Sequence, residues 1–336
     1  FNNLPAGNYC VTVSDLNYCE SLICVTITQP SNTVSATASV TQQVTCNNAC
    51  DGAASVVASG GTAPYTFLWS ANSQTTQTAT GLCGGTSYTV RVRDNNGCEF
   101  TTTVSLPNPT VLTASVTGTS NSPCNGSATG TATVTASGGT APYTFSLGTP
   151  QATGNFTGLA AGNYVVTVTD NRGCTTTVPF VINQPPALTI TGINITSNYN
   201  GTQISCAGAC DGAATVVAAG GTGTYTFLWS NGQTTFTATG LCNNGGSVTV
   251  TDQNGCQVSG SILGTLTEPS AISLTVTNQI NIGCAGATSG SFEVVANGGT
   301  PNYSFFNGSS AQANGVYTNL PAGNYCVTVT DQNGCR

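Results

Sequence analysis

Apolar and polar residues alternate in short runs along most of this chain, with the period of two that predicts β-strands. Residues 88–93 (YTVRVR) would place Tyr88 and the two valines on one face and the arginines on the other. Residues 65–69 (YTFLW) would place three aromatic side chains on a single face. The DNNG that directly follows at 94–97 predicts a hairpin turn, because Gly97 suits a left-handed backbone position. The pattern therefore predicts an almost purely β protein.

The pattern repeats along the chain with a period of about 80 residues, which is too long for a solenoid unit and suits a small sandwich domain. Gly-Gly-Thr recurs at Gly60, Gly138, Gly220 and Gly298. The turn signature Asp-x-x-x-Cys ends at Cys98, Cys174, Cys256 and Cys335. Seven short strands per repeat, with Trp69 on the third, predict a tandem array of immunoglobulin-like β-sandwich domains.

These landmarks divide the chain into one partial hairpin and four repeats. Residues 1–30 are predicted to be the closing hairpin of a preceding repeat. Three complete repeats are predicted to follow, at 31–109, 110–185 and 186–269. The last segment, 270–336, is predicted to be a repeat without its last strand. Proline at each junction, beginning with Gln29-Pro30, predicts short and semi-rigid linkers. Repeats 31–109 and 186–269 share a Trp (Trp69, Trp229) and four cysteines, so a two-repeat unit has been duplicated.

The sixteen cysteines predict disulfides and an oxidising, extracellular location. Repeat 110–185 has only Cys124 and Cys174, so these two pair if cysteines bond within a repeat. By analogy each repeat joins a cysteine fourteen residues before Gly-Gly-Thr to its turn cysteine. The predicted pairs are Cys10–Cys24, Cys46–Cys98, Cys50–Cys83, Cys124–Cys174, Cys206–Cys256, Cys210–Cys242 and Cys284–Cys335, with Cys19 and Cys326 unpaired within the chain.

Composition excludes several functional classes. The chain has no His, and its only four cationic side chains are arginines, against eleven acidic residues, for a net charge of −7. It therefore lacks the basic surface that binds nucleic acid or an anionic membrane. Without His the chain cannot form a Ser-His-Asp catalytic triad or a Cys-His catalytic dyad, and without Lys it cannot form a Schiff base. We expect no enzyme activity, no cofactor and no metal site, and this segment contains no stretch long enough to predict insertion in a membrane.

Three weaker signals compete with structural interpretations. The Cys46-x-x-x-Cys50 spacing resembles part of a zinc site, but disulfides explain the cysteines better. Asp94 and its equivalents offer one carboxylate each to a calcium ion, whereas Asp is also the favoured first residue of a turn. Trp69 and Trp229 suit a carbohydrate-stacking platform, yet a Trp on the third strand of a sandwich is more often in the core.

Three phrases carry a family resemblance that covers the whole chain: GGTAPYTF at 60–67, LPAGNYCVTVTDQNGC at 320–335 and ITQP at 27–30. They resemble the SprB repeat of large surface proteins of Bacteroidota. The resemblance implies export by type IX secretion, a cell-surface filament and adhesion during gliding. Leu147 and Asn307 at the Trp position, and Tyr18 in place of the turn glycine, depart from the pattern and affect packing only.

The function expected from these observations is a structural, adhesive repeat region of a secreted surface filament or stalk. The alternatives are an array of carbohydrate-binding modules and the non-catalytic repeat region of a larger secreted enzyme. Expected partners are other copies of the chain or neighbouring repeats in a filament, and a surface polysaccharide under the carbohydrate-binding alternative.

Overall fold

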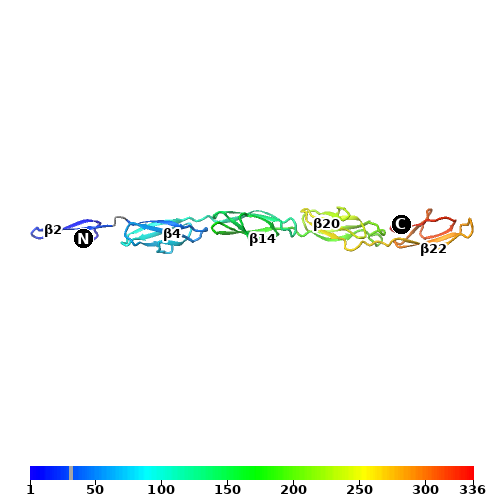
Figure 1. The fold of residues 1–336 in the computed structure, drawn as a ribbon, viewed down its shortest axis with the longest axis horizontal. Coiled ribbons are helices and arrows are strands. Elements are labelled where there is room, and N and C mark those ends of the chain that lie inside the picture. Colours follow the sequence, from blue (N-terminus) through cyan, green and yellow to red (C-terminus); the bar gives the residue numbers. More distant parts are fainter. Residues whose placement is uncertain (30–32) are drawn as a thin grey trace. The chain divides into compact units, whose positions relative to one another are not determined.

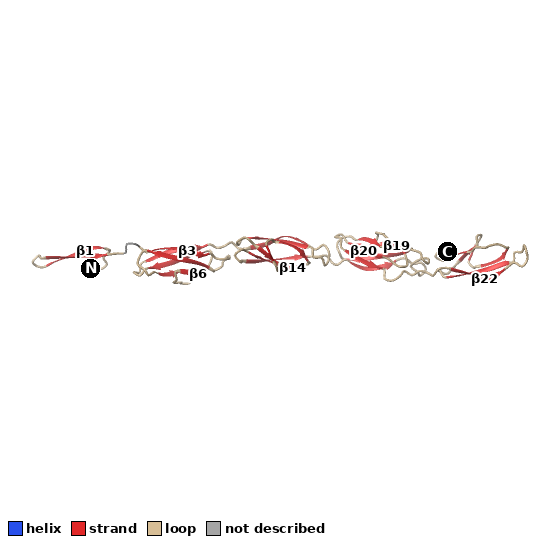
Figure 2. Cartoon of the chain, viewed as in Figure 1, coloured by secondary structure: helices blue, strands red, loops and turns tan. Residues whose placement is uncertain are grey.

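The structure is a computed structural model that describes residues 1–29 and 33–336. Figure 2 shows only strands and loops in these residues, which confirms the predicted all-β fold. Pro30 and Ser31, on which the first predicted linker and domain boundary fall, lie outside the described residues. Within the described ranges, no helix is long and apolar enough to cross a membrane.

Repeat 31–109, which contains the strand labelled β4 in Figure 1, is a sandwich of two three-stranded sheets, in the orders β3-β4-β6 and β5-β7-β8. Trp69 lies between them at 1% exposure, surrounded by small apolar side chains such as Ala54, Val56 and Val90. The alternation predicted for residues 88–93 is observed, since Val90 and Val92 are buried and the arginines exposed. The strands are β3 (Ser35–Gln42), β4 (Gly52–Ser59), β5 (Thr66–Trp69), β6 (Thr78–Leu82), β7 (Thr86–Arg93) and β8 (Glu99–Leu106).

The Trp-type repeats have six strands rather than the predicted seven. In repeat 31–109 the main-chain N–H of Trp69 donates to the Gln74 carbonyl at 2.9 Å, and its indole N–H donates to the Thr76 carbonyl at 3.0 Å. These bonds hold the segment after β5 as a loop against the core. Repeats without the Trp instead place a two-residue strand there, at Pro150–Gln151 and Ala311–Gln312.

Repeat 110–185 is the one described repeat with seven strands. Its sheets have the orders β13-β10-β9 and β12-β11-β14-β15. Phe145 and Phe156 are buried in the place of a Trp-centred core. The strands are β9 (Thr113–Ser120), β10 (Gly130–Ser137), β11 (Thr144–Ser146), β12 (Pro150–Gln151), β13 (Asn155–Leu159), β14 (Gly162–Thr169) and β15 (Thr175–Ile182).

Repeat 186–269 reproduces the first sandwich around Trp229, and repeat 270–336 packs a smaller core around Phe305 and Tyr317. Their sheets are β16-β17-β19 with β18-β20-β21, and β22-β23-β26 with β25-β24-β27. The former has β16 (Thr189–Ile195), β17 (Gly212–Ala219), β18 (Thr226–Trp229), β19 (Thr237–Leu241), β20 (Ser247–Thr251) and β21 (Gln257–Ser261). The latter has β22 (Ser273–Ile280), β23 (Gly290–Asn297), β24 (Ser304–Phe306), β25 (Ala311–Gln312), β26 (Val316–Leu320) and β27 (Thr328–Thr330).

The first twenty-nine residues form a two-stranded hairpin of β1 (Gly7–Ser14) and β2 (Glu20–Ile27). Cys10 lies directly opposite Cys24 in the register, and the two are bonded, as the hairpin alignment predicted. Most side chains of β2 are exposed, because no second sheet among the described residues covers this hairpin.

The chain divides into two compact units, and the division passes through repeat 110–185. The first unit comprises Phe1–Thr119, Thr131–Thr157 and Asn163–Val181, and the second comprises Ser120–Gly130, Gly158–Gly162 and Ile182–Arg336. The five sequence segments proposed as domains follow the repeat pattern, and their boundaries stay a prediction.

Candidate functional site: the repeat junctions

Three disulfides join each repeat to the next one along the chain. Cys46–Cys174 lies in the first unit, and Cys124–Cys256 and Cys206–Cys335 lie in the second. Each bonds a cysteine in the loop after the repeat's first strand to the cysteine of the closing hairpin turn in the following repeat. The Cα atoms are 5.7 Å apart in all three, near the usual separation for a disulfide.

The structure contradicts the four pairings predicted within single repeats. In repeat 31–109 the turn after β7 lies beside the end of β4, since the Asn95 amide donates to the Thr62 carbonyl. Cys46 follows the other end of β3, which spans about 25 Å at roughly 3.3 Å per residue, too far for a disulfide. The wrong pairs are Cys46–Cys98, Cys124–Cys174, Cys206–Cys256 and Cys284–Cys335.

The remaining cysteines pair within a repeat or stay free. The structure has Cys50 bonded to Cys83 and Cys210 bonded to Cys242, as the cysteine arithmetic predicted. Cys98 and Cys284, predicted to be paired, are exposed free thiols. Cys19 and Cys326 are also exposed and free.

A buried aspartate fixes the turn that carries each junction cysteine. In repeat 110–185 one Asp170 carboxylate oxygen accepts from the amides of Arg172 and Cys174, both at 2.9 Å. The other oxygen accepts from the Thr140 amide at 2.8 Å. Desolvation alone would raise the pKa of Asp170, but these backbone hydrogen bonds outweigh it and lower the pKa. The aspartate therefore acts as a turn anchor, the structural interpretation preferred over calcium binding.

The same turn occurs in the neighbouring repeats. Asp94 accepts from the Thr62 amide at 2.9 Å, and this bond is the main cause of its lowered pKa. Asp252 is exposed over only 5% of its surface, and backbone hydrogen bonds lower its pKa against the opposing effect of burial. Among the described residues, no group of three or more Cys, Asp and Glu side chains could hold a metal ion.

The loop that carries the other cysteine is organised by a second aspartate. The Thr45 hydroxyl donates to one oxygen of Asp51 at 2.6 Å, and the Thr45 amide donates to the other at 3.1 Å. The hydroxyl is the main cause of the lowered pKa of Asp51. The Ala49 amide closes the adjoining turn on the Cys46 carbonyl. Both partners of the disulfide are thus held by hydrogen-bonded turns.

A side chain beside each disulfide bonds across the junction. It lies two residues before the turn cysteine and donates to a backbone carbonyl one or two residues before the loop cysteine of the preceding repeat. Arg172 reaches the Val44 carbonyl at 2.9 Å, Asn254 the Pro123 carbonyl at 3.0 Å, and Asn333 the Ser205 carbonyl at 3.0 Å.

A second contact bonds the cysteine loop to the linker. The backbone amide two residues after the loop cysteine donates to the side-chain oxygen of the residue before the linker proline. The pairs are Asn48 with Asn108 at 2.8 Å, Gly126 with Gln184 at 2.7 Å, and Gly208 with Glu268 at 2.9 Å. The recurrence at three places identifies a built junction rather than incidental contact.

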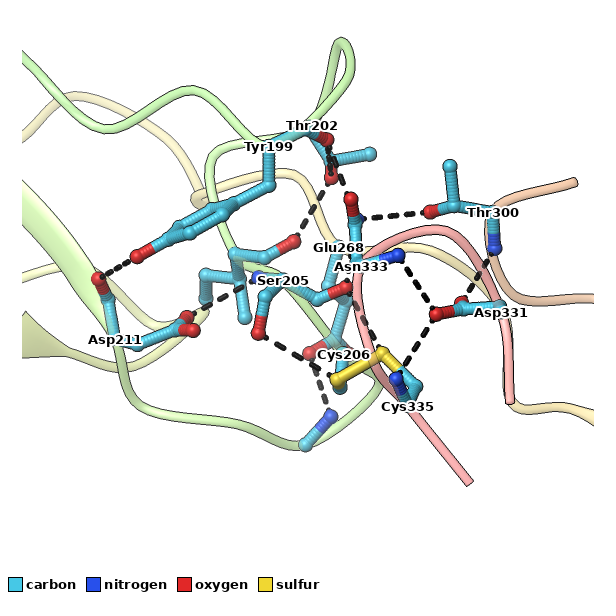
Figure 3. Close-up of a disulfide and its surroundings, with 12 residues drawn as sticks. Tyr199, Thr202, Ser205, Cys206, Asp211, Glu268, Thr300, Asp331, Asn333 and Cys335 are labelled. Atoms are coloured by element: carbon cyan, nitrogen blue, oxygen red, sulfur yellow. Dashed lines mark hydrogen bonds between the residues drawn. A yellow bond between two sulfur atoms is a disulfide. The ribbon is translucent and has the colours of Figure 1, made fainter. Parts of the chain in front are cut away.

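Figure 3 shows the junction at Cys206–Cys335, where Asn333 points from the closing turn of repeat 270–336 into the loops of repeat 186–269. Besides Ser205, its amide nitrogen lies 2.9 Å from the Thr300 hydroxyl, and its amide oxygen accepts from Asn200. The sequence analysis did not single out Arg172, Asn254 or Asn333. Their constant offset from the turn cysteine is the signal that would have found them.

The aromatic residues considered as a carbohydrate platform lie in the core instead. Trp69 and Trp229 are each exposed over only 1% of their surface, and both indole N–H groups donate to main-chain carbonyls. The Tyr65 ring packs against the core, and its hydroxyl donates to the Gly60 carbonyl at 2.6 Å. The two tryptophans hold their sandwiches together and present no open ring face.

Repeated small β-sandwiches, each joined to the next by a disulfide and a proline linker, define this protein as a tandem immunoglobulin-like repeat protein. Residues 38–74, 116–152 and 198–234 match the SprB repeat. Each of the three complete repeats therefore contains one match to the SprB repeat. A search of curated proteins found no match.

Several solved structures of tandem β-sandwich proteins are similar at low identity. Invasin, a bacterial integrin-binding protein, is 13% identical with a TM-score of 0.34, covering 89% of this chain and 76% of invasin. A tetra-tandem repeat from the extending region of a large adhesion protein is 17% identical with a TM-score of 0.24, covering 89% of each chain. The eight N-terminal Ig domains of Down Syndrome Cell Adhesion Molecule are 13% identical with a TM-score of 0.26. That match covers 98% of this chain, which spans half the length of the other.

Proposed function

We propose that this chain is a structural and adhesive repeat region of a secreted protein that stands at the cell surface as a filament or stalk. The observation that carries the proposal is the junction itself. Each repeat is bonded to the next by a disulfide, and the same two hydrogen-bonded contacts recur beside it. Three junctions of the same kind link neighbouring repeats covalently. A spacer requires such repeated links, whereas a single catalytic centre does not.

Composition and family support the same proposal. With four arginines and no Lys or His, the surface is uncharged enough to depend on Ser, Thr, Asn and Gln for solubility. The six disulfides fit an extracellular compartment. The SprB-repeat match favours export by type IX secretion and a role in gliding adhesion, without enzyme activity. Neighbouring repeats or other copies of the chain are the partners proposed within the filament.

Antibody labelling of intact cells tests surface display. Gold-labelled antibody against this chain should decorate filaments outside the cell before permeabilisation, and a Fab fragment should reduce attachment of the cells to glass. A Fab against an unrelated surface protein is the control. Label seen only after permeabilisation, or attachment unaffected by saturating Fab, would overturn the proposal.

A further inference from the structure

The three junction disulfides have interleaved positions along the chain. Cys124 lies between Cys46 and Cys174, and Cys206 lies between Cys124 and Cys256. Each disulfide spans about 130 residues and overlaps the next by roughly 50 residues in sequence. Every junction therefore has two covalent connections, the peptide linker and the disulfide.

Two continuous covalent routes follow from this connectivity. The first crosses from Cys46 to Cys174, follows β15, the linker and β16 to Cys206, and crosses to Cys335. The second follows β8, the linker and β9 to Cys124, crosses to Cys256, and continues along β21 to β22. At each junction one route uses the peptide and the other uses the disulfide.

About half of the backbone on the first route is already in extended strands. The first route contains roughly 30 residues between Cys174 and Cys206, and β15 (Thr175–Ile182) and β16 (Thr189–Ile195) form about half of them. The strands between the first and the closing strand of each complete repeat lie on neither route. In repeat 31–109 these are β4 to β7, the strands that enclose Trp69.

From this connectivity we propose that the chain carries tension along the first covalent line, from Cys46 through Cys174 and Cys206 to Cys335, which bypasses the cores of its sandwiches. Pulling on the ends loads β3, β15 and β16 together with the Cys46–Cys174 and Cys206–Cys335 disulfides. The core strands cannot be drawn out while the junction disulfides hold, so the repeats resist mechanical unfolding. This property goes beyond surface attachment and does not depend on which surface or ligand the protein binds.

The Cys50–Cys83 and Cys210–Cys242 disulfides give an internal control, because neither lies on the first covalent line. Without the three junction disulfides, the shortest covalent path from Cys46 to Cys335 grows from roughly 30 to roughly 220 residues. At about 3.4 Å per residue, this is about 100 Å against about 750 Å.

Single-molecule force spectroscopy on the oxidised chain, with handles at both termini, tests the proposal. The variant carrying C46S, C174S, C124S, C256S, C206S and C335S should extend by about 650 Å more than the wild type. The variant carrying C50S, C83S, C210S and C242S should extend like the wild type. Should the first variant fail to fold, the milder pair C46S and C174S should add about 100 Å, since its shortest path is roughly 60 residues.

Two results would overturn the proposal. One is a wild-type extension as long as that of the variant without junction disulfides. The other is a control variant that extends by several hundred ångströms while its junction disulfides are intact by mass spectrometry. Loss of surface attachment is a separate measurement, so the proposal on display and the proposal on tension can fail independently.

Discussion

Cys174 is bonded to Cys46, 128 residues earlier, and not to Cys124 of its own repeat. The Asp170-anchored turn holds Cys174 against the β3–β4 loop, where its sulfur lies 3.4 Å from the Thr45 carbonyl oxygen. A covalent bond between neighbouring repeats removes the freedom that a proline linker alone would leave. The stability of each repeat is thus coupled to that of its neighbour.

The pairing has a direct chemical test. Non-reducing peptide mapping should recover Cys46 linked to Cys174, Cys124 to Cys256 and Cys206 to Cys335. Cys98 and Cys284 should react with iodoacetamide before reduction, because both thiols are exposed and free. A peptide that links Cys124 to Cys174 in the oxidised protein would contradict the junctions.

Counting cysteines could not distinguish pairing within a repeat from pairing with the next repeat, and the reason is physical. Each repeat supplies one loop cysteine and one turn cysteine, so pairing within a repeat and pairing with the next repeat balance equally well. What decides is distance, because the loop and the turn lie at opposite ends of the same sandwich. Cys50 and Cys83 are a different case, since both lie at the same end and only one pairing within the repeat is left for them.

Local features were more predictable than the junctions. The alternation in residues 88–93 directly gave the buried faces of β7, because burial follows a period of two. Trp69 was correctly expected in the core. The side chains of Arg172 and Asn254 could not be placed, since their partners come from another repeat.

The turn aspartates predict a loss of stability in acid. A carboxyl whose pKa is lower in the folded than in the unfolded state stabilises the fold above its unfolded pKa of about 3.9. That contribution disappears as the pH falls through the folded value, so the melting temperature should decrease steeply below about pH 4. Asp252→Asn should lower the melting temperature at pH 7 and reduce the drop between pH 7 and pH 3. An unchanged drop would exclude Asp252 as a cause.

The Gly-Gly-Thr turn predicts an intolerant glycine. Gly220 has φ +80°, and a Cβ there would lie 1.9 Å from the Ala187 carbonyl oxygen. Gly232 has a similar φ of +84° with open space around it. Gly232→Ala should cost about 1 kcal/mol from backbone strain alone, and Gly220→Ala at least about 3 kcal/mol, because the backbone must also move. Equal losses in denaturant unfolding would mean that the close approach to Ala187 is absent.

The last prediction concerns Asn333, which lies in a turn whose cysteine is bonded across a junction, whereas the turn at Asp94 carries a free cysteine. Its side chain donates to the Ser205 carbonyl across the junction and to Thr300 within its own repeat. Asn96 occupies the equivalent position beside the free Cys98 and bonds only within its repeat, to Thr62. Asn333→Ala should therefore weaken the junction by at least about 1 kcal/mol, the typical net worth of one hydrogen bond, because the bond from Asn200 is lost as well.

Reduction of the Cys206–Cys335 disulfide measures that loss. With the thiols at equilibrium with dithiothreitol, Asn333→Ala should shift the ratio of reduced to oxidised junction at least about 5-fold toward the reduced form. Asn96→Ala should leave this ratio unchanged, although it removes the equivalent bond within a turn. If both variants shifted the ratio equally, turn stability rather than the contact with Ser205 would control the disulfide. If neither did, the hydrogen bonds across the junction would contribute nothing to its closure.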